Sequence, residues 1–176
     1  ARFVLLVRDP FSWLNSSWNQ LALRDRARWY KDLDAWRYGG DACDYGDASE
    51  ADALGPHQLP GVRSHFRLWG GHYRRLRQNL PEERTLLIRL LDWKAAPQRL
   101  AEFLSLPAEH LHLEEREQYR ARGDLGLIHR IDGEYLHELA EEYCGDLIRD
   151  LFPDIGSREA AVAAGILPPA EGRGAR

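Results

Sequence analysis

The stretch VRDPFSWLNSSW, residues 7–18, contains two side chains whose types and spacing suit the binding of a phosphate group. Arg8 comes directly after the apolar run Phe3–Val7, and Ser16 stands eight positions after it. A guanidinium can hold a phosphate through two parallel charge-assisted hydrogen bonds, and a hydroxyl can donate a third. The structural alternative is an Arg8 that pairs with Asp9 or a nearby glutamate and a Ser16 that faces solvent. Spacing alone leaves both interpretations open.

The elements around these two residues predict where they lie. Phe3–Val7 is a continuous apolar run rich in branched residues, which is typical of a strand covered on both faces in a parallel sheet. Asp9 is the expected N-cap of a following helix, with Pro10 at its first position. Ser16 falls opposite the apolar stripe of this helix, which comprises Phe11, Leu14, Trp18 and Leu21. Ligands of such sheets bind beyond the carboxyl ends of the strands, where Arg8 is placed.

The rest of the chain continues to alternate strands with helices. The predicted elements are a long loop or partly ordered insertion over Tyr38–Gly61, a helix with an apolar stripe from Val62 to Leu80, a second buried strand over Glu83–Trp93, a short helix over Pro97–Leu104, and a long amphipathic helix after Asp132. This order predicts a helix-rich α/β domain with a partial parallel sheet flanked by helices. We expect the domain to cover residues 1–153, with residues 154–176 as a C-terminal tail.

Composition excludes several classes of function. The formal net charge of −4 argues against non-specific binding to nucleic acid or to an anionic membrane. No apolar run approaches the roughly 20 residues that cross a bilayer. Cys43 and Cys144 are far apart, which suggests no disulfide framework or zinc site and makes the reduced cytoplasm the expected location. His110 and His112 lack a distant further ligand, so no metal site is predicted.

VRDPFSWLNSSW resembles the 3′-phosphate-binding segment of sulfotransferases that use 3′-phosphoadenosine 5′-phosphosulfate (PAPS), in which a strand leads into Arg-(Asp/Asn)-Pro and a Ser follows eight positions after the Arg. LWGGHYRRLRQNLPEERTLLIRLLDWKAAPQRLAEFLSLP and EYLHELAEEYCGDLIRDLF are similar to later elements of that family, in the same order. The resemblance covers about residues 3–153. It implies a three-layer α/β/α fold related to P-loop NTPases, with Arg8 and Ser16 on the 3′-phosphate and Ser17 as a less favoured substitute.

A second segment, RARGDLG, is similar to the part of the family that holds the 3′-phosphate from the C-terminal side. It offers Arg122, Gly123 and Gly126 at matching spacing, and a solvated arginine-rich loop is the alternative. The family's Tyr-Glu-Asp is Leu90-Leu91-Asp92 here, so a contact between Leu90 and adenine could only be apolar.

The family's Gly-rich 5′-phosphosulfate loop and its His or Glu base should precede Phe3–Val7, and neither is in this sequence. The catalytic residues are therefore not identified. The chain opens directly on a strand without a Met, which predicts that the sequence begins inside a longer domain and that this strand has an exposed edge able to support self-association.

The expected activity, in the complete protein, is transfer of a sulfuryl group from PAPS to a hydroxyl or amine of a small-molecule, lipid or glycan acceptor. Two alternatives stay open. One is a non-catalytic remnant or interaction module of the same fold. The other is a P-loop kinase relative that binds ATP. A preference for a nucleotide with a 3′-phosphate would distinguish the sulfotransferase from the kinase, and the remnant would bind neither nucleotide.

Overall fold

The computed structural model describes residues 1–23, 36–39, 41–111 and 123–167 of the chain. Its elements are β1 (Phe3–Val7), α1 (Pro10–Ala22), α3 (Ala48–Leu54), α4 (Val62–Asn79), β2 (Thr85–Arg89), α5 (Ala96–Leu104), α6 (Gly133–Leu151) and α7 (Arg158–Ala163), joined by short 3-10 helices. The fold is helix-rich α/β with a small parallel sheet. Within the described residues, no helix is long and apolar enough to cross a membrane.

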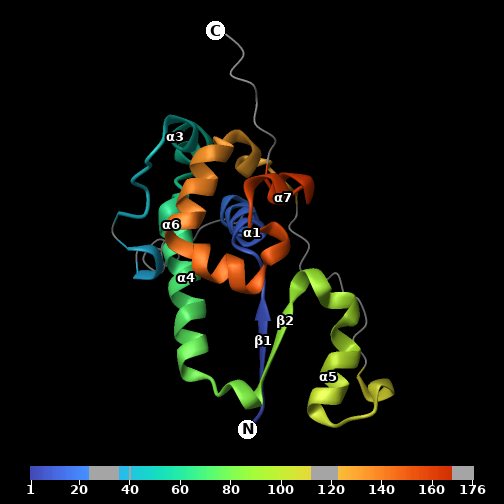
Figure 1. The fold of residues 1–176 in the computed structure, drawn as a ribbon. Helices are drawn as coiled ribbons and strands as arrows, with labels where there is room; N and C mark the ends of the chain where they lie inside the picture. The colour runs from blue at the N-terminus through green and yellow to red at the C-terminus, as the bar shows by residue number, and fades with distance from the viewer. Residues whose placement is uncertain (24–35, 40, 112–122, 168–176) are drawn as a thin grey trace.

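The two strands lie side by side and pair in parallel, with Val7 opposite Arg89 at their carboxyl ends. Helix α4 runs alongside β1, and α5 runs alongside β2 (Figure 1). Side chains of both helices donate to strand carbonyls: the Tyr73 hydroxyl donates to Leu6 O at 3.3 Å, and the Arg99 guanidinium donates to Leu87 O at 2.9 Å. The helices therefore supply hydrogen bonds that further strands would otherwise provide.

Local sequence explains where the main helices begin. Asp9 Oδ1 accepts from Ser12 N at 2.8 Å and caps α1, which has Pro10 at its first position, as predicted. Asp132 Oδ1 caps α6 by accepting from the backbone N–H groups of Glu134 and Tyr135. The stripes of α1, α4 and α6 form one core with residues from α3 and α7, and its largest side chains are Trp18, Trp69, Phe11, Phe66 and Phe152.

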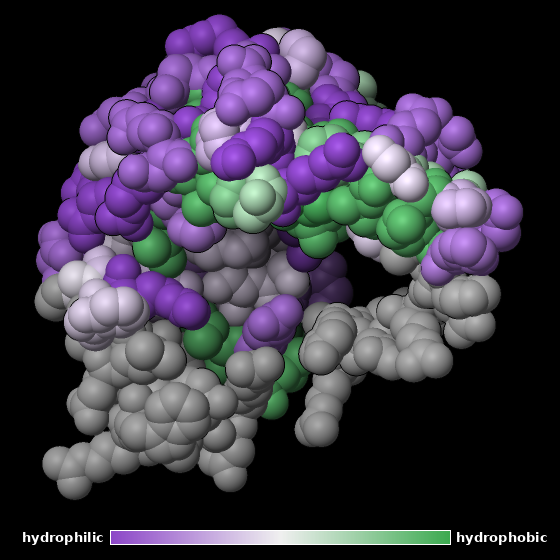
Figure 2. All heavy atoms as spheres, turned by 90° about the horizontal axis from the view of Figure 1, so that it is seen from below, coloured by the Kyte–Doolittle hydropathy of each residue, from purple (hydrophilic) through white to green (hydrophobic). Residues whose placement is uncertain are grey.

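The prediction that Phe3–Val7 is covered on both faces is wrong for the described part of the chain. Val7 is buried, whereas Val4 and Leu6 remain 42% and 46% exposed. Alternate residues of a strand point to opposite faces, so Val4 and Leu6 belong to one open face. Viewed from the end where the amino ends of the strands lie, hydrophobic residues gather in a band beside a hollow (Figure 2).

Three further segments differ from their predictions. The second strand stops at Arg89, and Leu90–Ala95 continues as a 3-10 helix that contains a kink at Asp92. The segment Tyr38–Gly61 contains helix α3 rather than only a loop. Part of the region expected to be a C-terminal tail also packs on the domain, since Ile155, Ala161 and Leu167 are buried in the core.

Glu50 stabilises the folded conformation of the segment Tyr38–Gly61. Its carboxylate is 1% exposed and accepts from three donors: Gly46 N at 3.0 Å, Val62 N at 2.6 Å and the Tyr135 hydroxyl at 2.6 Å. The contact with Val62 satisfies a free N–H at the start of α4, and the contact with Tyr135 ties the segment to α6. A buried carboxylate is stable only when it is hydrogen-bonded in this way.

Candidate functional site

Arg8 lies at the carboxyl end of β1, as predicted, and its guanidinium is available for a ligand. Its side chain is partly buried, and its backbone carbonyl accepts a hydrogen bond from Trp69 Nε1 at 3.0 Å. Among the described residues, no hydrogen bond or ion pair involves its guanidinium. In particular, Arg8 forms no ion pair with Asp9. Burial lowers the pKa of Arg8, and the negative charge of Asp9 opposes this shift. A partly desolvated, unpaired cation is a strong partner for an anion.

Arg89 is the last residue of β2, opposite Val7, and its charge is already paired with carboxylates. Its Nε donates to Asp92 Oδ2 at 2.7 Å, and its other nitrogens contact Asp154 and Leu151 O. The guanidinium also lies over the Phe152 ring, 5.7 Å from the centroid. The hydrogen bond with Asp92, followed by that with Asp154, raises the pKa of Arg89. Of these two arginines at the carboxyl edge, only Arg8 has no protein partner in the described structure.

The helix N-terminus after Arg8 is occupied by its own cap. Asp9 is fully buried, and its Oδ1 holds the first-turn N–H of Ser12. Asp9 Oδ2 is buried without a hydrogen-bond partner in the described structure. An anion would therefore meet the Arg8 guanidinium rather than the free N–H groups of α1, because a carboxylate already lies at those groups.

The two serines of α1 have different environments. Ser17 Oγ lies 3.1 Å from His65 Nε2 and 3.4 Å from the Tyr38 hydroxyl, so it belongs to an internal polar cluster. Ser16 is partly buried and is contacted only by Gln20 Nε2, at a long 3.5 Å, within the described structure. Of the two hydroxyls, Ser16 is therefore the one with fewer partners in the described structure.

The glycine-containing segment after residue 122 is held against α1 by Asn19. Asn19 Nδ2 donates to Asp124 Oδ1 at 3.0 Å, and Leu125 N donates to Asn19 Oδ1 at 2.8 Å. Gly126, in the left-handed region with a φ of 62°, also donates its N–H to Asp124 Oδ1. Hydrogen bonds from Gly126 and Asn19 lower the pKa of Asp124, which keeps it ionised.

This contact places the glycine segment against the C-terminal half of α1. Asn19 stands one helical turn after Ser16, and Gly123 lies close to Leu23 at the end of the same helix. Arg122, the other predicted residue of the segment, lies outside the described residues. Sequence reasoning missed Asn19. The signal was an asparagine inside a helix, where its side chain is unfavourable unless it bonds elsewhere.

The expected adenine neighbour Leu90 lies beside a surface hollow. Leu90 and Leu91 are 41% and 52% exposed and line a hollow of about 590 Å³ with Trp93 and Arg99. This hollow lies just after the carboxyl end of β2, on the same edge of the sheet as Arg8. Its apolar leucines can contact a planar base only through van der Waals packing.

His65 is a core residue and carries no charge at neutral pH. Its Nδ1 donates to Gly61 O at 3.1 Å, which leaves Nε2 to accept from Ser17. Burial lowers the pKa of His65 to about 4. The ring lies among Trp13, Trp18 and Tyr38. His57, in contrast, is exposed.

Arg8 before α1 and the hydroxyl of Ser16 on α1 are two groups that suit an anion, and the glycine segment is anchored nearer the C-terminal end of the same helix. Lys94 is exposed after β2, and Lys31 lies outside the described residues. Comparison of the chain with protein-family models, with curated protein sequences and with solved structures returned no match.

Proposed function

We propose that this chain supplies the 3′-phosphate-binding part of a PAPS-dependent sulfotransferase. The observation that carries the proposal is the unpaired Arg8 guanidinium at the carboxyl edge of the sheet. Ser16 on α1 adds a hydroxyl, and Asn19 holds the Gly123 segment against the same helix. A 3′-phosphate would accept two hydrogen bonds from the Arg8 guanidinium and one from the Ser16 hydroxyl.

In the proposed reaction, sulfur leaves the 5′-phosphate oxygen of PAPS and bonds to a hydroxyl or amine of a small-molecule, lipid or glycan acceptor. The products are the sulfated acceptor and 3′-phosphoadenosine 5′-phosphate. Positioned donors on the transferring group and a base near the acceptor are required for such a step. Since the 5′-phosphosulfate loop is not in these residues, the transfer requires groups outside this sequence.

Three finer expectations belong to the same proposal. The two-stranded sheet and its helices would form part of a three-layer α/β/α sulfotransferase fold. The cytoplasm is the proposed location, on the basis of two cysteines that are both free. Self-association through β1 is the proposed behaviour of the isolated chain.

The first prediction concerns binding of 3′-phosphoadenosine 5′-phosphate to the purified chain. Charge-assisted hydrogen bonds contribute about 1.5–3 kcal/mol each, so Arg8→Ala should weaken binding by at least about tenfold. Ser16→Ala removes one neutral donor and should weaken it less. Isothermal titration calorimetry measures both. Arg75→Ala is the control, because Arg75 is an exposed arginine on α4 and should leave affinity unchanged.

Titration with ADP separates the proposal from its alternatives. A sulfotransferase site prefers the nucleotide with a 3′-phosphate. Equal affinity for ADP would favour a kinase-type site, and no binding of either nucleotide would favour a non-catalytic module. An Arg8→Ala variant that binds as tightly as the parent would contradict the assignment of Arg8.

A further inference from the structure

A second cavity lies between α1 and α4, close to the Arg8 site. It has a volume of about 280 Å³ and is lined by Trp13, Arg37, Leu68, Trp69, His72 and Tyr73. Four of these residues belong to α4 and one to α1, so two helices fix most of its wall. Aromatic walls with a few polar groups are typical of small-molecule sites.

The polar ends of two aromatic walls are already engaged. Trp69 Nε1 donates to Arg8 O, and the Tyr73 hydroxyl donates to Leu6 O. Burial raises the pKa of Tyr73, so its hydroxyl stays protonated and remains a donor. The Trp69 and Tyr73 rings lie 4.8 Å apart with 58° between their planes. Tyr73, which is only partly buried, therefore offers the cavity ring surface rather than a hydrogen-bonding group, and Trp69, at 2% exposed, backs this wall from the core.

The groups that can recognise a polar substituent are His72 and Arg37. Both are exposed, and no hydrogen bond to either side chain is found in the described part of the structure. The His72 ring packs edge-on to Tyr73, with centroids 5.3 Å apart. An imidazole nitrogen can accept from a hydroxyl, and a guanidinium favours the oxygen that gains negative charge.

We propose that this cavity binds a single aromatic ring that bears a hydroxyl group. An apolar cavity of about 150 Å³ is enough to hold benzene, so the larger cavity here has room for one ring and a small substituent. The ring packs against the Trp13 indole and the Tyr73 ring, and the hydroxyl reaches His72 and Arg37.

The cavity shares a wall with the Arg8 site, because Trp69 contacts both. The identification of the ring as the sulfuryl acceptor rests on the proposed function, whereas ring binding does not. As acceptor, the phenolic oxygen would form the new bond to sulfur, the bond from sulfur to the 5′-phosphate oxygen of PAPS would break, and the phenolic proton would pass to His72.

The test is ligand-observed NMR titration of the purified chain with 4-methylphenol and with its methyl ether, which lacks the hydroxyl hydrogen. We expect 4-methylphenol to bind at least about fivefold more tightly than the ether. Trp13→Ala should weaken both ligands by at least about tenfold. His72→Ala should remove the preference for the phenol and leave the ether unchanged. Trp36→Ala is the matched control, because Trp36 is 81% exposed and does not line the cavity.

Leu68→Trp is a second variant in case Trp13→Ala does not fold. Its larger side chain fills the cavity, so it should also abolish binding of both ligands. Binding of 4-methylphenol that survives both Trp13→Ala and Leu68→Trp would overturn the inference, as would equal affinity for the ether. If the chain binds 3′-phosphoadenosine 5′-phosphate but not 4-methylphenol, the ring site is wrong and the proposed function stands. If it binds only 4-methylphenol, the ring site stands and its role as acceptor site fails with the proposed function.

Discussion

At the scale of single residues, His65 shows how burial fixes the chemistry of a side chain. It is fully buried among aromatic rings, and its two nitrogens are satisfied by Gly61 O and Ser17. Both hydrogen bonds use the neutral ring. Protonation would place an unpaired charge in the core and would break the bond that Ser17 donates.

We predict a loss of stability as the pH falls through the range of histidine. The pKa of His65 is about 4 in the folded chain and about 6.5 in the unfolded chain, so the unfolded chain takes up the proton first. Its contribution is complete above about pH 6.5 and is lost as the pH falls toward 4. Between pH 7 and pH 5 the free energy of unfolding should fall by about 2 kcal/mol through this residue.

Urea unfolding at pH 7 and pH 5 measures the effect. His65→Gln is the control, because it should be less stable at pH 7 and show a smaller change with pH. A histidine titration by NMR provides a direct check. A His65 ring that becomes protonated near pH 6.5 in the folded chain would contradict the prediction.

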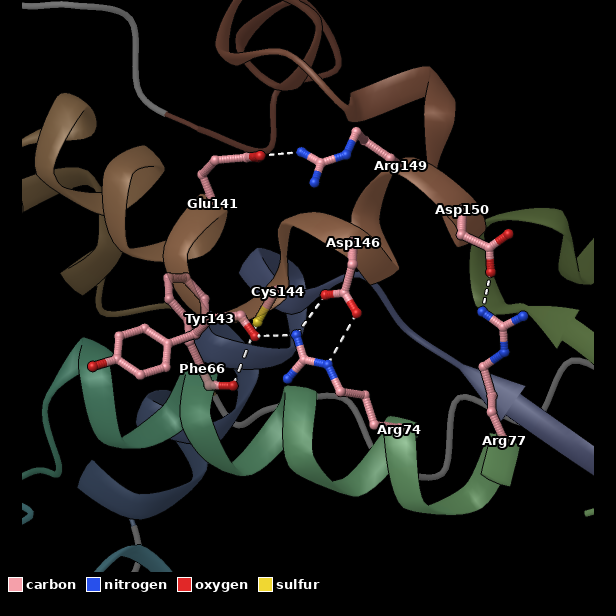
Figure 3. A network of polar contacts seen from close by, with 9 residues as sticks. All are labelled: Phe66, Arg74, Arg77, Glu141, Tyr143, Cys144, Asp146, Arg149 and Asp150. Carbon is pink, nitrogen blue, oxygen red and sulfur yellow. Dashed lines mark hydrogen bonds and ion pairs between the residues drawn. The ribbon is translucent and has the colours of Figure 1, made fainter. Parts of the chain in front are cut away.

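At the scale of elements, the contact between α4 and α6 organises the helical layer. Arg74 on α4 binds both carboxylate oxygens of Asp146 and donates to Tyr143 O at 2.8 Å, as Figure 3 shows. Arg77 and Asp150 form a second ion pair between the helices, and Cys144 Sγ donates to Phe66 O at 3.4 Å. Burial raises the pKa of the Cys144 thiol to about 12, so it stays protonated. The exposed ion pairs add little stability, and close backbone approach is the stronger constraint.

Gly70 permits that approach, which predicts opposite effects for two neighbouring glycines of α4. A Cβ on Gly70 would lie 2.6 Å from Tyr143 O, whereas a Cβ on Gly71 would meet nothing within 4 Å. Gly71→Ala should stabilise the chain by about 0.5–1 kcal/mol through helix propensity. Gly70→Ala gains the same propensity but should be destabilising overall, because overpacking costs about 1–3 kcal/mol. Urea unfolding of the two variants measures the difference in their free energies of unfolding. Equal midpoints would contradict the prediction, because they would mean that α6 moves away from the new Cβ without loss of stability.

At the scale of the whole molecule, one apolar face of β1 remains exposed in the described part of the chain. The backbone edge of β1 is less open than expected, since α4 donates hydrogen bonds to the carbonyls of Leu6 and Arg8. The side chains of Val4 and Leu6 remain exposed next to one another on one face. Burial of apolar area contributes about 25 cal/mol per Å², so this face can drive association.

We predict that the isolated chain self-associates by pairing this face between two copies. Leu6→Lys should shift the population toward monomer, because a charge would be buried without a partner. Sedimentation velocity over a range of concentrations measures it. Leu106→Lys is the matched control, since Leu106 is also 46% exposed but follows α5 rather than lying on β1. A parent chain that stays monomeric at high concentration would contradict the prediction.

The sequence by itself determined the local features of this protein. The cap and first position of α1, the stripes of α4 and α6 and the place of Arg8 after a strand were all predicted, because they depend on residues within a few positions of one another. Strand length was predicted less well, since the apolar run past Arg89 suits a 3-10 helix as well as a strand.

Only the tertiary structure decided which of these residues are available. Arg8 and Arg89 look alike in sequence, and Asp154, far along the chain, neutralises Arg89 alone. Ser17 is distinguished from Ser16 by His65, and α3 is fixed by the contact of Glu50 with Tyr135. These partners are between 48 and 85 residues away. The physical reason is that burial and hydrogen bonding depend on neighbours in space, which a local sequence pattern does not specify.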